Sequence, residues 1–131
     1  MKTILIVDDE KNLLKLYEKE FTEEGYQVIT ASSGADALQK IQEAPLDLVI
    51  LDIRMPDLNG VETLKKIMES TTKVPVILNS AYTSYRDNFL TWAAEAYVVK
   101  SSDLSELKAK AKEVLEKHSK AQQVGSAGPS D

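Results

Sequence analysis

The sequence predicts an α/β fold, a doubly wound parallel sheet of five strands with five helices on its two faces. Short apolar runs alternate along the chain with longer segments whose apolar residues recur at helical spacing. The runs 4–7 and 46–51 are continuously apolar, which is typical of strands buried on both faces. Strands that alternate with helices form parallel sheets, and right-handed crossovers leave only a few topologies.

Residues that begin or end helices separate the predicted elements. Gly25 follows the first helical pattern as a C-terminal cap, and Pro45 stops the second. From about Ser119 the chain is rich in Gln, Ser, Gly and Pro, so we expect a domain over 1–118 and a flexible tail or linker over 119–131. The predicted strands are 4–7, 26–30, 46–51, 74–78 and 96–99, and the predicted helices are 13–21, 35–43, 61–68, 84–94 and one that begins near 103.

Length and composition exclude several classes of protein. The 131 residues are enough for one domain with its own core. A net charge of −5 argues against nucleic-acid binding, and the absence of cysteine excludes disulfides and thiolate metal sites. The first apolar run stops at Asp8-Asp9, too early for a signal peptide, and no stretch reaches the length of a membrane span. We therefore expect a cytoplasmic protein without direct membrane or nucleic-acid contact.

Polar residues stand where the predicted strands end. Asp8 and Asp9 follow the first strand, Asp52 the third, Ser80 the fourth and Lys100 the fifth. In doubly wound sheets this carboxyl edge is where ligands bind. Carboxylates about 5 Å apart repel by roughly 3 kcal/mol per pair at an effective dielectric near 20. A hard divalent cation such as Mg²⁺ would relieve that repulsion, so the sequence predicts a magnesium site.

The same residues suit phosphoryl transfer. A carboxylate can attack phosphorus to give an aspartyl phosphate, and such transfers depend on positioning and charge neutralisation. Asp52 is the expected acceptor because it ends the central strand, while Lys100 would neutralise a phosphoryl oxygen and Ser80 would donate a hydrogen bond to another. Each residue alone is ordinary in a turn or on a surface. The prediction therefore depends on the observation that the residues at four strand ends all suit the same chemistry.

With these residues in view, the chain resembles the receiver domain of bacterial response regulators from Lys2 to about Lys117. The resemblance implies the flavodoxin-like strand order 2-1-3-4-5. The motifs that carry it are Ile4-Leu5-Ile6-Val7-Asp8-Asp9-Glu10, Leu48-Val49-Ile50-Leu51-Asp52-Ile53-Arg54-Met55-Pro56, Asn59-Gly60, Val74-Pro75-Val76-Ile77, Ser80-Ala81 and Tyr97-Val98-Val99-Lys100.

For the acceptor site, the resemblance implies a Mg²⁺ ion for which Mn²⁺ can substitute. Asp52 would be both acceptor and metal ligand. Asp9 would bind the metal directly, Asp8 through water, and Arg54 through its backbone carbonyl. Lys100 would pair with the phosphoryl group. The donor would be a phosphohistidine on a sensor histidine kinase or on a phosphotransfer protein.

For signalling, the resemblance implies that Ser80 and Tyr97 form a switch, in which the Tyr97 rotamer follows the Ser80–phosphoryl contact. A downstream protein would bind the face made by the predicted helix 84–94, strand 96–99 and the last helix. We expect a monomer or a weak homodimer. Arg54 and Tyr82 lie close enough in sequence to the site to tune the lifetime of the phosphoryl group.

Several positions depart from the family pattern, among them Ser101 and Asn79. Ser101 stands where the family has proline after the strand-five lysine. Because a cis bond without proline costs about 3 kcal/mol, we predict a trans Lys100–Ser101 peptide. Asn79 places a polar side chain at the end of the fourth strand, where an apolar residue is usual. His118, the single histidine, is expected to be a solvated residue near the end of the last helix and not a phosphorylation site.

The expected role is a signalling switch and not an enzyme, beyond limited self-catalysed phosphorylation and dephosphorylation. A phosphohydrolase with an aspartate nucleophile would need a second acid two residues later, where Arg54 stands. A nucleotide-binding domain would need a glycine-rich loop after the first strand, where the acidic residues stand. The remaining alternative is a receiver-like interaction module whose switching is impaired or rewired.

Overall fold

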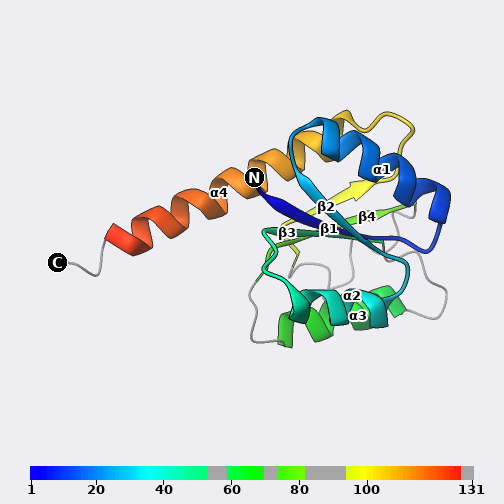
Figure 1. Ribbon diagram of the computed structural model, residues 1–131, viewed down its shortest axis with the longest axis horizontal. Coiled ribbons are helices and arrows are strands. Elements are labelled where there is room, and N and C mark those ends of the chain that lie inside the picture. Colours follow the sequence, from blue (N-terminus) through cyan, green and yellow to red (C-terminus); the bar gives the residue numbers. More distant parts are fainter. Residues whose placement is uncertain (53–58, 70–73, 82–93, 128–131) are drawn as a thin grey trace.

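A five-stranded parallel sheet forms the centre of the molecule (Figure 1). The computed structural model describes residues 1–52, 59–69, 74–81 and 94–127. The strands are β1 (Thr3–Val7), β2 (Gln27–Ala31), β3 (Leu48–Leu51), β4 (Val76–Ser80) and β5 (Ala96–Val99). They lie in the order β2-β1-β3-β4-β5 and every neighbouring pair is parallel. The predicted fold class and strand order are therefore confirmed.

Each face of the sheet packs against its own apolar cluster. Alternate residues of a strand point to opposite faces, so Ile4 and Ile6 of β1 join one cluster while Leu5 and Val7 join the other. The first cluster includes residues of helices α1 (Lys11–Glu23) and α4 (Ser105–Ala127), and the second includes residues of α2 (Gly34–Glu43) and α3 (Asn59–Glu69). Figure 1 shows these pairs of helices on opposite sides of the sheet.

The end of α1 confirms the predicted glycine cap. Gly25 has a φ of 98°, a left-handed conformation that glycine adopts at little steric cost. Its amide donates to the Thr22 carbonyl at 3.0 Å, and the Tyr26 amide donates to the Phe21 carbonyl at 3.2 Å. These bonds satisfy carbonyls that the helix end would otherwise leave unpaired, and they turn the chain into β2.

The last helix continues farther than its sequence pattern indicated. The apolar positions that face the core end at Leu115, yet α4 runs to Ala127 and extends beyond the sheet (Figure 1). Residues 119–127 are therefore helical. Helix formation is cooperative, so a helix anchored by core contacts can continue for further turns beyond them. The role of 119–131 as a tail or linker stays a prediction.

The remaining expectations concern single segments. The predicted helix 84–94 lies almost entirely outside the described residues. No peptide bond in the described part of the chain is cis, so the Lys100–Ser101 bond is trans, as predicted. Among the described helices, none is long and apolar enough to cross a membrane.

Candidate functional site

The carboxyl edge of the sheet gathers the predicted site residues, because hydrogen bonds of the sheet type continue past the strand ends. The Asp8 amide donates to the carbonyl of Ala31 at 3.1 Å, and the Asp52 amide donates to that of Val7 at 3.0 Å. The Lys100 amide donates to the Ser80 carbonyl at 2.8 Å. The backbones of all three site residues are therefore held in the register of the sheet.

Lys100 joins two buried carboxylates. Its Nζ lies 2.7 Å from Asp8 Oδ2 and 3.0 Å from Asp52 Oδ2. The side chains of both aspartates are 1% exposed, and that of Lys100 is 12% exposed. At these exposures the charges are poorly screened, so the ammonium group is the main counter-charge of both carboxylates.

The pKa of Lys100 reflects this arrangement. Burial alone would lower the pKa, because it disfavours the charged form. The hydrogen bonds and negative charges of Asp8 and Asp52 outweigh burial and raise the pKa above its ordinary value. Lys100 is therefore a cation throughout the neutral pH range.

The acidic cluster at the start of α1 fits a hard metal ion. Carboxylate oxygens of Asp8, Asp9 and Glu10 lie within 4.8 Å of one another, with Asp8 buried and the other two exposed. The Glu10 amide donates to Asp8 Oδ1 at 2.9 Å, which orients the carboxylate. Asp8 Oδ2 is buried and receives no aligned hydrogen bond from the described residues, although the Lys100 charge is close. An oriented, all-oxygen donor set of this kind suits Mg²⁺.

The predicted ligand set and this cluster overlap without being identical. The structure brings Asp8 and Asp9 together as predicted and adds Glu10, which the sequence showed only as the next residue of the motif. Asp52 is linked to the cluster through Lys100. Arg54, the predicted carbonyl ligand, and Tyr82, the other residue expected to tune the site, both lie outside the described residues.

The predicted switch residues lie on one face of the sheet. Ser80 is fully buried at the end of β4, and Tyr97 of β5 is half-buried. Leu78 pairs in register with Tyr97, and Ser80 pairs with Val99. Because side chains two residues apart share a face, Ser80 and Tyr97 both face the α2–α3 side, where Tyr97 packs against the apolar cluster. This placement is compatible with the switch roles, which stay a prediction.

A buried polar contact behind the site was not predicted. Asn79 Nδ2 of β4 donates to the Tyr17 hydroxyl of α1 at 3.1 Å, and the two residues are 3% and 2% exposed. The sequence showed Asn79 as a polar residue in an apolar position, and it showed Tyr17 on the apolar stripe of the first helix. Neither pattern alone identifies a partner, because the two residues are 62 positions apart.

His118 lies at the opposite edge of the sheet, as expected. It lines a small cavity of about 60 Å³ with residues that precede strands, among them Lys2, Leu46 and Pro75. Its placement near the end of the last helix was wrong, because α4 continues to Ala127. The side chain is 37% exposed, with Nε2 3.4 Å from a Glu95 carboxylate oxygen.

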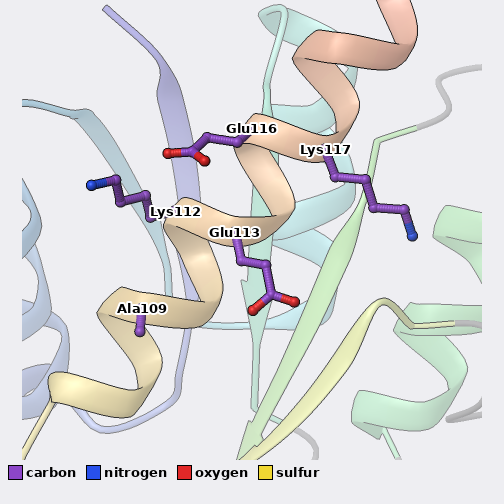
Figure 2. A pocket seen from close by; sticks show the side chains of 5 residues that line it. All are labelled: Ala109, Lys112, Glu113, Glu116 and Lys117. Atoms are coloured by element: carbon purple, nitrogen blue, oxygen red, sulfur yellow. The ribbon is translucent and has the colours of Figure 1, made fainter.

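A groove of about 680 Å³ borders the outer surface of α4. Figure 2 shows Lys112 and Glu116 leaving the helix on one side and Lys117 on the other. Among the residues that the structure describes, the lining comes from this helix and includes none of the predicted site residues: Ala109, Lys112, Glu113, Glu116 and Lys117. Lysines and glutamates in alternation are typical of a solvated helix face.

The fold and the acidic edge together define a doubly wound α/β domain with a candidate metal site, and comparison with known proteins identifies its family. The sequence model of the family described as the response regulator receiver domain matches residues 4–112. The chain belongs to this family and is the receiver domain of a two-component response regulator. Domains of this family are signalling switches and not conventional enzymes.

The chain is similar to the response regulator ArlR of Staphylococcus epidermidis, with 39% identity over 117 residues. The match covers 88% of this chain and 53% of ArlR, so the chain spans about half the length of the curated relatives it matches. The ArlR of Staphylococcus aureus is 38% identical with the same coverage.

Among solved structures, the response regulator TrrA of Thermotoga maritima superposes with a TM-score of 0.82 at 46% identity, covering 87% of this chain and 99% of TrrA. That TrrA structure is a complex with Mg²⁺-BeF. A second TrrA structure is a complex with the histidine kinase ThkA, with a TM-score of 0.80 over 88% of this chain and 99% of TrrA.

Proposed function

We propose that this receiver domain accepts a phosphoryl group on Asp52 in a Mg²⁺-dependent reaction and signals the modification to a protein partner. The observation that carries the proposal is the contact of one buried ammonium group, Lys100 Nζ, with the carboxylates of both Asp52 and Asp8. A buried lysine between two carboxylates places a positive charge where a phosphoryl group on Asp52 would carry its negative oxygens.

The donor would be a phosphohistidine on a sensor histidine kinase or on a phosphotransfer protein. An oxygen of the Asp52 carboxylate attacks phosphorus while the bond from phosphorus to the donor nitrogen breaks, and the electron pair of that bond stays on the imidazole. Lys100 is held within reach of the new phosphoryl group. The Ser80 hydroxyl would donate to a second phosphoryl oxygen, and Tyr97 would follow that contact.

The residues that would hold Mg²⁺ are Asp8, Asp9 and Asp52, together with the Arg54 carbonyl, and Glu10 lies beside them. When bound, the ion would neutralise charge on the transferred group, and Mn²⁺ can take its place. Asp8 now shares its charge with Lys100. With a metal ion held by Asp8, the ammonium group of Lys100 would keep its contact with Asp52. The complex of TrrA with Mg²⁺-BeF supports this proposal by similarity.

The proposed partners follow from the family. The complex of TrrA with ThkA supports a histidine kinase as donor. The downstream partner would bind the face formed by the predicted helix 84–94, β5 and α4. Arg54 and Tyr82 are the proposed tuning residues for the phosphoryl lifetime. The domain would work in the cytoplasm as a monomer or weak homodimer without nucleic-acid contacts of its own.

The test is an amide NMR titration with Mg²⁺ and then with beryllofluoride, which mimics a phosphoryl group on Asp52. Asp52→Asn is the control. We expect shifts at Asp8, Asp9, Ser80 and Lys100 that spread to Tyr97 and vanish in the control. Shifts confined to the strand ends would favour the alternative, a receiver-like interaction module with rewired switching. A lack of response to both ions would refute phosphoryl acceptance.

A further inference from the structure

Lys100 reaches the acidic residues by crossing a neighbouring strand. It follows β5, and its ammonium group contacts Asp52 and Asp8, which follow β3 and β1. In the strand order β2-β1-β3-β4-β5, β4 lies between β5 and β3. Neighbouring strands are about 4.8 Å apart, so the lysine side chain must extend across the full width of β4.

The residue that lies below this path is Asn79. Ile77, Ile50 and Val98 belong to the apolar cluster on the α1–α4 side of the sheet. Side chains two residues farther along a strand share the same face, which places Asn79 on the face that Lys100 crosses. The register supports this placement, because Ile77 pairs with Ile50 and Asn79 pairs with Val98.

Tyr17 belongs to α1, which covers this face of the sheet, and its hydroxyl accepts a hydrogen bond from the Asn79 amide. The 3.1 Å bond from Asn79 Nδ2 to the Tyr17 hydroxyl commits one end of the amide and so sets its orientation. The two polar groups are buried in a cluster that is otherwise apolar. A buried polar pair in such surroundings is stable only while both members stay bonded, so the contact has one strongly preferred geometry.

The Tyr17 hydroxyl also lies within electrostatic range of the site. Its pKa is raised, chiefly because burial disfavours the phenolate. The bond from Asn79 and the positive charge of Lys100 oppose this effect, while the charges of Asp8 and Asp52 reinforce it. The Tyr17 hydroxyl therefore interacts electrostatically with the charged groups of the site.

We propose that Asn79 and Tyr17 are positioning residues. Their hydrogen-bonded side chains hold the Lys100 side chain extended over β4 toward Asp52 and Asp8. The inference rests on the proposed function, because Lys100 matters for phosphoryl acceptance only if Asp52 is the acceptor. Losing the bond between them would leave neither the Asn79 nor the Tyr17 side chain fixed in its orientation, so the surface over which the lysine extends would no longer have one shape. The pair also links α1, which follows the acidic cluster, to the strand that carries Ser80.

The variants Tyr17→Phe and Asn79→Leu remove the bond from either side at nearly constant volume. Tyr26→Phe is the matched control, because it removes a hydroxyl from a second tyrosine at the same apolar cluster, a half-buried one whose ring centroid is 6.1 Å from that of Phe21. Urea unfolding first establishes that each variant folds. If Tyr17→Phe does not fold, Asn79→Leu tests the same bond.

The first readout is the maximal rate at which Asp52 is phosphorylated by phosphoramidate with saturating Mg²⁺. We expect Tyr17→Phe and Asn79→Leu to be about tenfold slower than the wild type, because small misplacements of charged groups strongly slow a positioned reaction. The concentration of phosphoramidate at half-maximal rate should be unchanged, and Tyr26→Phe should match the wild type. In a Lys100→Met background, Tyr17→Phe should cause no further slowing. An equal slowing there would overturn the inference, because the pair would then act independently of Lys100.

The second readout needs no phosphoryl transfer. The Nζ signal of Lys100, assigned by its loss in Lys100→Met, is recorded by NMR on the protein without Mg²⁺ or donor. We expect the signal to broaden or disappear in Tyr17→Phe and to persist in Tyr26→Phe. An unchanged signal in Tyr17→Phe overturns the positioning role. If the wild type is not phosphorylated, the proposed function fails, and this signal alone decides the inference.

Discussion

Replacing Lys100 by methionine removes the positive charge between two buried carboxylates while keeping most of the side-chain volume. The oxygens of Asp8 and Asp52 that Lys100 contacts are separated by no more than the sum of the two contact distances, 2.7 and 3.0 Å. Two unit charges at about that separation repel by roughly 3 kcal/mol at an effective dielectric of 20. Losing one partner of a buried pair has a typical effect of about 3–5 kcal/mol. We expect Lys100→Met to lower the free energy of unfolding by about 3 kcal/mol at pH 7 without Mg²⁺.

Mg²⁺ should reverse this loss, because the ion would supply the missing positive charge. In the wild type the ion must compete with Lys100 for Asp8, so Lys100→Met should bind Mg²⁺ more tightly. At about 100 times the dissociation constant, binding stabilises the folded state by roughly 2.7 kcal/mol. The variant should nevertheless be phosphorylated far more slowly, since no ammonium group would then meet the phosphoryl oxygens.

Urea unfolding followed by circular dichroism, with and without Mg²⁺, measures both effects. Lys117→Met is the matched control, because that side chain is 71% exposed and lies 3.3 Å from Glu95. Its unfolding free energy should change by less than about 0.5 kcal/mol. The reasoning is wrong if Lys100→Met is as stable as this control without Mg²⁺, or if the variant binds Mg²⁺ no more tightly than the wild type.

Three further predictions concern single groups. The pKa values of Tyr17 and Lys100 are raised in the folded state above their ordinary values of 10.0 and 10.5, so the protonated forms of both groups stabilise the fold at lower pH. This contribution is lost as the pH rises through the folded pKa values. The unfolding free energy should therefore decline above about pH 10, and it should decline less in Tyr17→Phe. Gly34→Ala should destabilise by about 1–3 kcal/mol because its Cβ would clash with Thr63 Oγ1, and adding Thr63→Ala should restore most of the loss in the same unfolding assay. Asp9→Asn should weaken Mg²⁺ binding in a calorimetric titration with little effect on stability, since Asp9 is exposed; unchanged affinity would remove Asp9 from the ligand set.

The periodicity of the sequence was sufficient for most of the fold. Continuous apolar runs predicted β1 and β3, whose residues are nearly all buried, and Gly25 predicted the end of α1. Periodicity was insufficient at α4, whose final turns have no core-facing pattern. Those turns depend on the anchored helix that precedes them, and local composition alone suggested a tail.

The sequence by itself determined which residue types end the strands, and therefore that carboxylates and a lysine would share one edge of a parallel sheet. Right-handed crossovers left only a few strand orders, and the family resemblance implied the order 2-1-3-4-5 among them. Only the tertiary structure decided that Lys100 contacts Asp8 as well as Asp52, and that Asn79 bonds to Tyr17. Those contacts depend on side-chain rotamers and on the position of α1 over β4. Both are set by packing between residues far apart in the chain, which no local pattern encodes.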